Sequence, residues 1–104
     1  MAKLMILYGH PADPAAFEDY YASRHLPYAS KHMPNVRGAE NMRVTSTSEG
    51  GPAPYFRVSQ LSYDTVDDLR SGIASEDGRS TIADLADFAT GGATLLIVEE
   101  NASD

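Results

Sequence analysis

The sequence predicts an α+β fold in which helices cover one face of a four-stranded antiparallel sheet. Two observations carry this prediction. Short apolar runs bounded by glycine or proline indicate strands, and apolar residues three and four positions apart indicate helices. The order along the chain is βαββαβ, with an extra short helix before the last strand, which is the ferredoxin-like arrangement. There is no internal repeat and no linker, so residues 1–104 are expected to form one domain.

The first and last predicted strands are apolar on both faces. The first runs from Lys3 to Tyr8 and is followed by Gly9 and Pro11, and the last runs from Ala93 to Val98. Helices on one side of a sheet leave its other side open. That open face needs a partner, and a second copy of the chain, packed sheet on sheet about a twofold axis, is the simplest one.

The first helix is predicted from Pro14 to His25, because Asp13 is a natural N-cap and proline suits the first helical turn. Pro27 has no N–H to return to the helix, and it biases the preceding residue away from helical angles. We therefore expect this helix to kink or stop close to His25. A second short helical piece is expected from Pro27 to His32.

The middle of the chain predicts two strands and another helix. Weak alternation indicates a strand from Gly38 to Ser46, and an aromatic and β-branched run indicates one from Tyr55 to Tyr63. The segment between them, Thr47 to Pro54, has the composition of a turn-rich loop. Asp64 or Thr65 is expected to cap the helix that follows.

The C-terminal part predicts a broken helix before the last strand. Ser75 to Gly78 reads as the break, and Ser80 or Thr81 as the cap of a short helix that ends at the glycine pair 91–92. The tail from Glu99 to Asp104 is polar and is expected to fray.

The composition excludes several classes of protein. The chain contains no cysteine, which excludes disulfides, thiolate chemistry and cysteine-ligated metals. The formal net charge of -7 at pH 7 makes nucleic acid and anionic membranes poor partners. No run approaches the roughly 20 apolar residues that span a bilayer. The segment from Met1 to Tyr8 reads as a strand rather than a signal peptide, so a cytoplasmic protein is expected.

The stretch from Phe17 to Tyr28 contains most of the side chains that could take part in a reaction. Phe17, Tyr21 and His25 are four positions apart and share one stripe of the predicted helix. Histidine side chains ordinarily titrate near neutrality, so an imidazole among aromatic rings is a candidate general acid or base. The alternative is that the rings are core and that His25 only caps its helix.

The histidines also raise the alternative of a metal or haem site. His10, His25 and His32 are the candidates. Pro27 lies between the second and third, so their spacing does not assure a shared helix face, and no glutamate sits at ligand spacing from either. We expect no metal and no other cofactor.

Several motifs along the chain carry a family resemblance. They are the run Leu4 to Tyr8, the pattern Phe17-x-x-Tyr20-Tyr21-x-x-x-His25-x-Pro27-x-Ala29 with the Gly38 that follows, the strand that starts at Pro54, the helix segment Asp67-Asp-Leu69, and Ser75-Glu-Asp-Gly78 with Asp84 and Phe88. On these motifs the chain resembles the EthD family of the dimeric α/β-barrel superfamily. The resemblance implies a homodimer whose two sheets form a barrel around a small cavity. It also implies His25 and its neighbour Tyr21 as site residues.

The activity that the resemblance implies is loosely defined. Relatives are linked to ether degradation, are often labelled reductases, and include cofactor-free enzymes that act on aromatic polyketides. The resemblance therefore implies an oxidoreductase or a lyase. Gly9-His-Pro is not glycine-rich and the glycine pair 91–92 precedes a strand, so the chain has no nucleotide fingerprint and no nicotinamide site is expected.

Two functions follow as hypotheses. The first is a cofactor-independent enzyme for a small apolar or aromatic carbonyl or phenolic compound. In it His25 acts as general acid or base, Tyr21 hydrogen-bonds it or the substrate, and the reaction is proton transfer, dehydration or decarboxylation. The second is a non-catalytic dimer that stores or senses a small apolar ligand. The residues expected to bind the ligand, by charge or by ring contact, are Tyr8, Arg43, Tyr55, Phe56 and Arg57.

Overall fold

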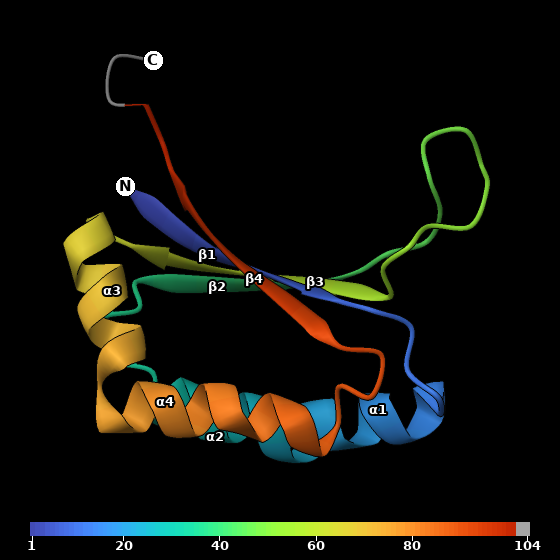
Figure 1. Cartoon of the computed structure of the whole chain (residues 1–104), viewed down its shortest axis with the longest axis horizontal. Helices are drawn as coiled ribbons and strands as arrows, with labels where there is room; N and C mark the ends of the chain where they lie inside the picture. Colours follow the sequence, from blue (N-terminus) through green and yellow to red (C-terminus); the bar gives the residue numbers. More distant parts are fainter. Residues whose placement is uncertain (102–104) are drawn as a thin grey trace.

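The computed structural model describes residues 1–101, so the end of the predicted tail, residues 102–104, lies outside the described part. The sheet and the helices form two layers, with the chain entering and leaving at the sheet (Figure 1). The elements are β1 (Ala2–Tyr8), α1 (Pro14–Tyr20), the π-helix η1 (Tyr21–His25), α2 (Leu26–His32), β2 (Gly38–Arg43), β3 (Arg57–Tyr63), α3 (Val66–Ala74), α4 (Glu76–Ala83), the 3-10 helix η2 (Asp84–Asp87) and β4 (Ala93–Glu99).

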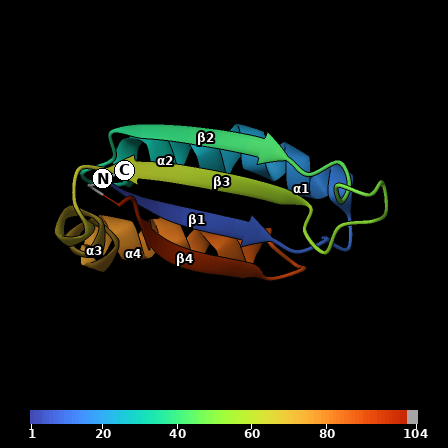
Figure 2. The same cartoon turned by 90° about the horizontal axis from the view of Figure 1, so that it is seen from above.

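The four strands form one antiparallel sheet in the order β2-β3-β1-β4. The two strands that begin and end the fold lie side by side, with Leu4 of β1 opposite Ile97 of β4 and also opposite Leu61 of β3. Figure 2 looks onto the face of this sheet that no helix covers. The predicted ferredoxin-like α+β fold, with its extra helix before the last strand, is confirmed.

The two faces of the sheet differ in burial. Along β1 every second residue is buried against the helices, as Leu4 and Tyr8 show with 1% exposure each. The residues between them face the other way and are only half-buried. On β4 the same open face carries Leu96 and Val98, which are 45% and 39% exposed. An apolar surface therefore remains open on the side away from the helices.

The first helical stretch runs without a stop from Pro14 to His32. Asp13 caps it through a hydrogen bond from the Ala16 N–H to its side chain at 3.1 Å. The expected kink or stop at His25 does not occur. Instead the chain widens into the π-turn η1, in which the Leu26 N–H reaches back to the Tyr21 carbonyl. The wide turn lets Pro27, which has no N–H, enter the first turn of α2 while the backbone stays helical.

The predicted helix break at Ser75 to Gly78 is wrong in its extent. Only Ser75 leaves helical geometry, and its side chain accepts the Gly78 N–H at 3.0 Å as the cap of α4. The predicted caps Ser80 and Thr81 lie inside that helix. Gly78 allows α3 and α4 to approach each other closely, because a Cβ there would meet the Gly72 carbonyl oxygen of α3 at 2.0 Å. At the start of α3, Thr65 is the cap, through the Asp68 N–H at 3.0 Å.

The strands β2 and β3 are shorter than predicted. β2 ends at Arg43 and β3 begins at Arg57, although the Val44 N–H still donates to the Phe56 carbonyl at 3.1 Å. The loop beyond this bond projects away from the helix layer (Figure 1).

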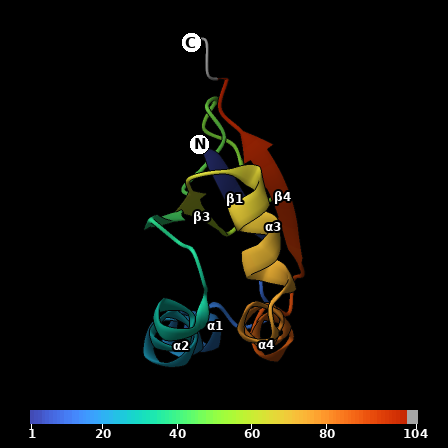
Figure 3. The ribbon, with the colours of Figure 1, turned by 90° about the vertical axis from the view of Figure 1, so that its left-hand side faces the viewer.

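The helices α2 and α4 lie next to each other below the sheet, and α3 stands upright between α4 and the sheet (Figure 3). No helix of residues 1–101 is long and apolar enough to cross a membrane.

Candidate functional site

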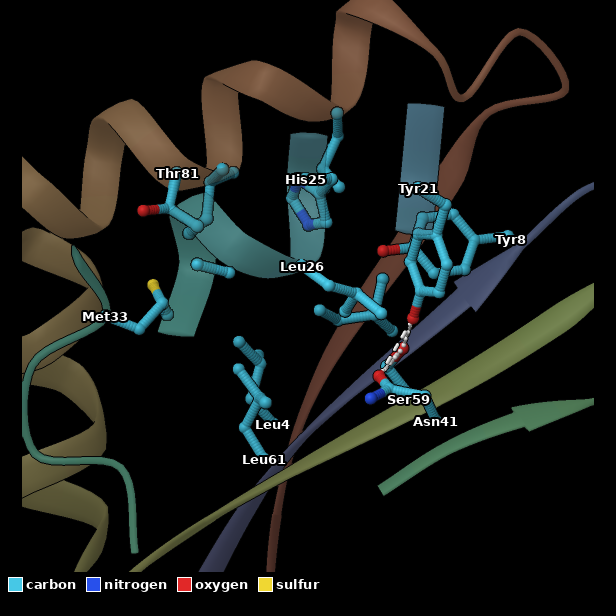
Figure 4. A pocket seen from close by; sticks show the side chains of 14 residues that line it. Leu4, Tyr8, Tyr21, His25, Leu26, Met33, Asn41, Ser59, Leu61 and Thr81 are labelled. Carbon is cyan, nitrogen blue, oxygen red and sulfur yellow. Dashed lines mark hydrogen bonds between the residues drawn. The ribbon is translucent and has the colours of Figure 1, made fainter. Parts of the chain in front are cut away.

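His25 lies between the helix layer and the sheet, where it is 5% exposed and borders a small cavity (Figure 4). The cavity has a volume of about 40 Å³. Since one water needs about 10–15 Å³ by this measure, it holds only a few water-sized groups. Its lining residues are Leu4, Ile6, Tyr8, Tyr21, His25, Leu26, Ala29, Met33, Asn41, Ser59, Leu61, Thr81, Ile82 and Leu85. We call this space the histidine cavity.

A carboxylate fixes the orientation of the imidazole. The Nδ1 atom of His25 lies 2.9 Å from Oδ2 of Asp84, which begins η2. The other carboxylate oxygen of Asp84 accepts the Tyr20 hydroxyl at 2.7 Å. Among the described residues the ring has a hydrogen-bond partner only at Nδ1. The carboxylate favours the proton on that nitrogen, so Nε2 carries the lone pair that can accept a proton.

The same contacts determine the charge of the carboxyl group. Burial raises the pKa of Asp84, but the hydrogen bonds from His25 and Tyr20 outweigh burial and lower that pKa below its usual range. The hydrogen bond to Asp84 in turn raises the pKa of Tyr20 to about 12. Asp84 is therefore an anion at neutral pH, and Tyr20 is a neutral donor.

Two aromatic rings hold the imidazole in place. The ring of Tyr21 is stacked on it at 5.9 Å between centroids, and the ring of Phe88 lies at 4.8 Å. The hydroxyl of Tyr21 lies 2.8 Å from Oδ1 of Asn41 and 2.6 Å from the Ser59 hydroxyl. The Ser59 hydroxyl also donates to Asn41 at 2.9 Å. Three oxygens share two protons here, so the three contacts are not all hydrogen bonds at the same moment.

The hydroxyl of Tyr8 is buried, with the residue 1% exposed, and among the described residues it has no partner at full hydrogen-bond geometry. The nearby Ser59 hydroxyl acts on it only enough to lower its pKa in part. Figure 4 shows the Tyr8 hydroxyl pointing from β1 into the histidine cavity. Burial raises the pKa of Tyr8 well above its usual value, so the group stays protonated. An unpaired buried donor costs stability, and a ligand oxygen in the cavity would satisfy it.

Arg57 and Glu18 form an ion pair at the edge of the aromatic cluster. The guanidinium donates to both carboxylate oxygens, at 2.9 and 2.7 Å, and lies over the Tyr21 ring with its Cζ at 4.9 Å from the centroid. The hydrogen bonds from Arg57 hold the pKa of Glu18 below its usual value. Arg57 therefore acts on the site through Tyr21, and it does not line the histidine cavity.

The structure brings together only some of the predicted site residues. His25, Tyr21 and Tyr8 line the histidine cavity, whereas the other four predicted ligand-binding residues, Arg57 among them, do not. Tyr55 is 37% exposed, Phe56 packs on Phe17 with centroids 5.2 Å apart, and Arg43 lies over the Phe56 ring at 5.8 Å.

The histidine cavity is formed by one chain alone. It lies between the helices and the sheet, lined from β1 by Leu4, Ile6 and Tyr8. These residues face away from the open sheet face because strand side chains alternate. The cavity between two sheets of a dimer, which the family resemblance implied, stays a prediction.

Sequence analysis missed Asp84, Ser59 and Asn41 as site residues. Asp84 is 59 positions from His25, and Asn41 and Ser59 meet because β2 and β3 pair at that register. Asp84 was part of the family motif, which was the only signal for it. The alternation of β2 and β3 placed Asn41 and Ser59 on a face but could not say which face met Tyr21.

The histidines do not gather into a metal site. The ring of His10 bonds the Ala53 carbonyl at 2.7 Å, and His32 lies 3.9 Å from Asp77 at the surface. Within residues 1–101 no group of three or more histidine, cysteine, aspartate or glutamate side chains is arranged to hold a metal ion.

Comparison with known proteins gives consistent results. A family model described as the EthD domain matches residues 9–92. An uncharacterised 11.0 kDa protein from the thcB–thcC intergenic region of Rhodococcus erythropolis is 35% identical over 100 residues, which cover 96% of this chain and 95% of the relative.

Two crystal structures show the same fold. An EthD family protein from Bacillus halodurans has a TM-score of 0.87 at 28% identity, over 97% of this chain and 99% of that chain. A dimeric protein of unknown function with a ferredoxin-like fold from Bacteroides fragilis has a TM-score of 0.65 at 11% identity, over 95% of each chain.

Proposed function

The chain belongs to the EthD family, and we propose that it is a homodimeric enzyme that performs acid–base chemistry without a cofactor on small apolar compounds. The substrate class is an aromatic or aliphatic compound with an activated carbonyl or a phenolic group. The observation that carries the proposal is the 2.9 Å contact between Nδ1 of His25 and Asp84. This contact leaves Nε2 without a hydrogen-bond partner among the described residues, and His25 lines the histidine cavity.

His25 is the proton acceptor in this proposal. Its Nε2 lone pair takes a proton from the carbon next to the substrate carbonyl, and the electron pair of that C–H bond moves to the carbonyl oxygen as an enolate. The imidazolium formed in this step faces the Asp84 anion, which stabilises it. Return of the proton to carbon or to oxygen completes the transfer.

Tyr8 is the donor that stabilises the enolate. Its hydroxyl is protonated, buried and without a well-formed hydrogen bond to the described residues, so it is free to donate to the developing oxyanion. Tyr21 positions the imidazole by stacking, while its own hydroxyl is held by Ser59 and Asn41.

The open face of the sheet supports the dimer. Met42 on β2 is 39% exposed there, and with Leu96 and Val98 it adds apolar area that water would otherwise contact. The similar fold from Bacteroides fragilis is described as dimeric. We propose that residues 1–104 form one domain whose open face packs on the same face of a second copy.

The test is hydrogen–deuterium exchange at the carbon next to a ketone. Phenylacetone in D₂O is followed by proton NMR with the wild-type protein, His25→Ala and His32→Ala. We expect the wild type to speed exchange, His25→Ala to return it to the buffer rate, and the surface control His32→Ala to keep it. Undiminished exchange in His25→Ala would reject the acid–base role.

The second candidate is a dimer that binds a small apolar ligand without turnover. The burial of His25, which is 5% exposed and bonded to Asp84, favours it. Binding of phenylacetone that shifts NMR signals of His25, combined with exchange at the buffer rate in the wild type, selects this alternative.

A further inference from the structure

A second and larger cavity adjoins the histidine cavity between α2 and β2. Its volume is about 390 Å³. Small-molecule sites in proteins typically measure about 300–1,000 Å³, so this space is large enough for a ligand. It reaches Gly38 and Ala39 at the edge strand of the sheet and Arg37 before it. We call it the outer chamber.

The two cavities share part of their walls. Leu26, Ala29, Met33, Asn41 and Leu61 line both of them. The histidine cavity and the outer chamber are therefore direct neighbours, with these residues as the wall between them. Met33 is the most adaptable of these residues, because methionine has three rotatable bonds and no branch.

The polarity of the walls changes along the joined space. At the inner end stand the imidazole of His25 and the unpartnered Tyr8 hydroxyl. Towards the outer chamber the walls are mostly apolar, from Leu26, Leu61 and Met33, and Ser30, Arg37 and Asn41 are their polar residues. A molecule that fits has one oxygen at its buried end and an apolar body behind it.

We propose that the histidine cavity and the outer chamber form one binding channel, gated by Met33, for an elongated apolar compound with one phenolic or enolic hydroxyl. The hydroxyl donates to Nε2 of His25 and accepts from the Tyr8 hydroxyl, while the apolar body fills the outer chamber. The identity of the inner site rests on the proposed function. An aromatic ring cannot enter a space of about 40 Å³ whole, so the ring sits at the position of Met33 and displaces its side chain.

The chain carries its own probe for this channel. Its four methionines are Met1, Met5, Met33 and Met42. Only Met33 lines either cavity, whereas Met5 and Met42 lie on the open face of the sheet. Methyl-labelled methionine therefore gives one reporter inside the channel and two controls outside it.

The experiment titrates 4-n-alkylphenols, from phenol to 4-hexylphenol, into the methyl-labelled full chain. We expect the Met33 methyl signal to shift while those of Met5 and Met42 stay in place. The affinity should rise by about fourfold for each added methylene until the outer chamber is full, since each buried methylene contributes about 0.8 kcal/mol. Affinity that is independent of chain length, or equal shifts at Met5 and Met42, overturns the channel.

Three variants sharpen this test. Ala29→Phe fills the wall that both cavities share, and we expect it to lower the affinity for 4-hexylphenol at least tenfold. Ala15→Phe places the same side chain at an exposed position of α1, outside both cavities, and should leave the affinity unchanged. Met33→Ala shortens the side chain that gates the channel. We expect this variant to fold and to bind the longer phenols more strongly. Equal affinities in all these variants contradict the proposal.

The outcomes separate this inference from the proposed function. Length-dependent binding with a Met33 shift, but no ketone exchange in the wild type, supports the channel and rejects catalysis. Exchange that depends on His25, without a Met33 shift from any alkylphenol, supports catalysis and rejects the channel.

Discussion

The space between the helices and the sheet is filled in different ways at its two ends. At one end, the rings of Tyr8, Phe56 and Phe88 pack around Phe17 with centroids 5.1 to 5.3 Å from its ring. At the other end, Leu26, Met33 and Leu61 leave the two cavities open.

The difference between the ends explains where the chemistry is placed. His25 stands at the boundary, with Tyr21 and Phe88 on its aromatic side and the histidine cavity on the other. A rigid aromatic end holds an imidazole in one orientation, and a loosely filled aliphatic end can admit a ligand.

The largest effect is expected from emptying the aromatic end. Phe17→Ala removes a ring that is 2% exposed and touches four others, and it should lower the free energy of unfolding by about 3–5 kcal/mol. The half-buried Met33 already borders space, so Met33→Ala should cost only about 1 kcal/mol. Urea unfolding followed by circular dichroism measures both. Equal losses would mean that the two ends do not differ.

The next effect is expected at the carboxylate behind the imidazole. Asp84→Asn removes the charge that stabilises the imidazolium, and it should slow phenylacetone exchange by about 100-fold. Glu18→Gln is the matched control, because it neutralises another partly buried, hydrogen-bonded carboxylate outside the cavity. A loss of the same size in Glu18→Gln would show that general electrostatics, not the contact with His25, matters.

Asp84 also predicts a dependence of stability on pH. Its pKa is lower in the folded protein than in the unfolded chain, so the unfolded chain binds the proton more readily as the pH falls. The stability that Asp84 contributes is complete above the unfolded pKa, about 3.9, and is lost as the pH drops through the folded value. Asp84→Asn should remove this part of the acid dependence. Unfolding curves measured between neutral and acid pH would detect it, and unchanged acid dependence would contradict it.

Tyr8→Phe should separate stability from activity. Removing an unpartnered buried hydroxyl should raise the free energy of unfolding by about 1 kcal/mol. Exchange of phenylacetone should nevertheless fall by roughly tenfold, because the enolate loses its donor. Tyr63→Phe is the control, since its hydroxyl is also buried and unpartnered but lies outside both cavities. Tyr8→Phe with full activity would show that this hydroxyl has no role in catalysis.

The smallest effect is expected at Tyr20, on the far side of Asp84. Tyr20→Phe removes one of the hydrogen bonds that lower the Asp84 pKa, so the acid loss of stability should be smaller and should be complete at a slightly higher pH. The His25 contact remains, and exchange should change by less than about threefold. A loss as large as that of Asp84→Asn would mean that Tyr20, rather than the carboxylate, orients the ring.

The division between the two ends was partly visible in the sequence. The spacing of Phe17, Tyr21 and His25 predicted their shared helix stripe, because helical period alone brings such residues together. The alternation in the first strand predicted its two faces in the same way. These are local properties, and the structure reproduces them.

The rest of the site depends on contacts between distant segments. Asp84 reaches His25 only because α4 and η2 pack beside α2, which no local pattern specifies. Gly78 was read as a helix break, although it serves the close approach of two helices. The first and last strands are apolar on both faces, so their sequence could not predict which face of the sheet packs against the helix that carries His25.

The most direct test of the site is the protonation of the two His25 ring nitrogens, measured by nitrogen-15 NMR at about pH 8, where histidine is ordinarily neutral. The structure predicts that Nδ1 carries the proton, held by Asp84, and that Nε2 carries the lone pair and shifts when 4-butylphenol is added. A proton on Nε2, or an Nε2 signal that ignores the phenol, would contradict the proposal that His25 is the base of this cavity.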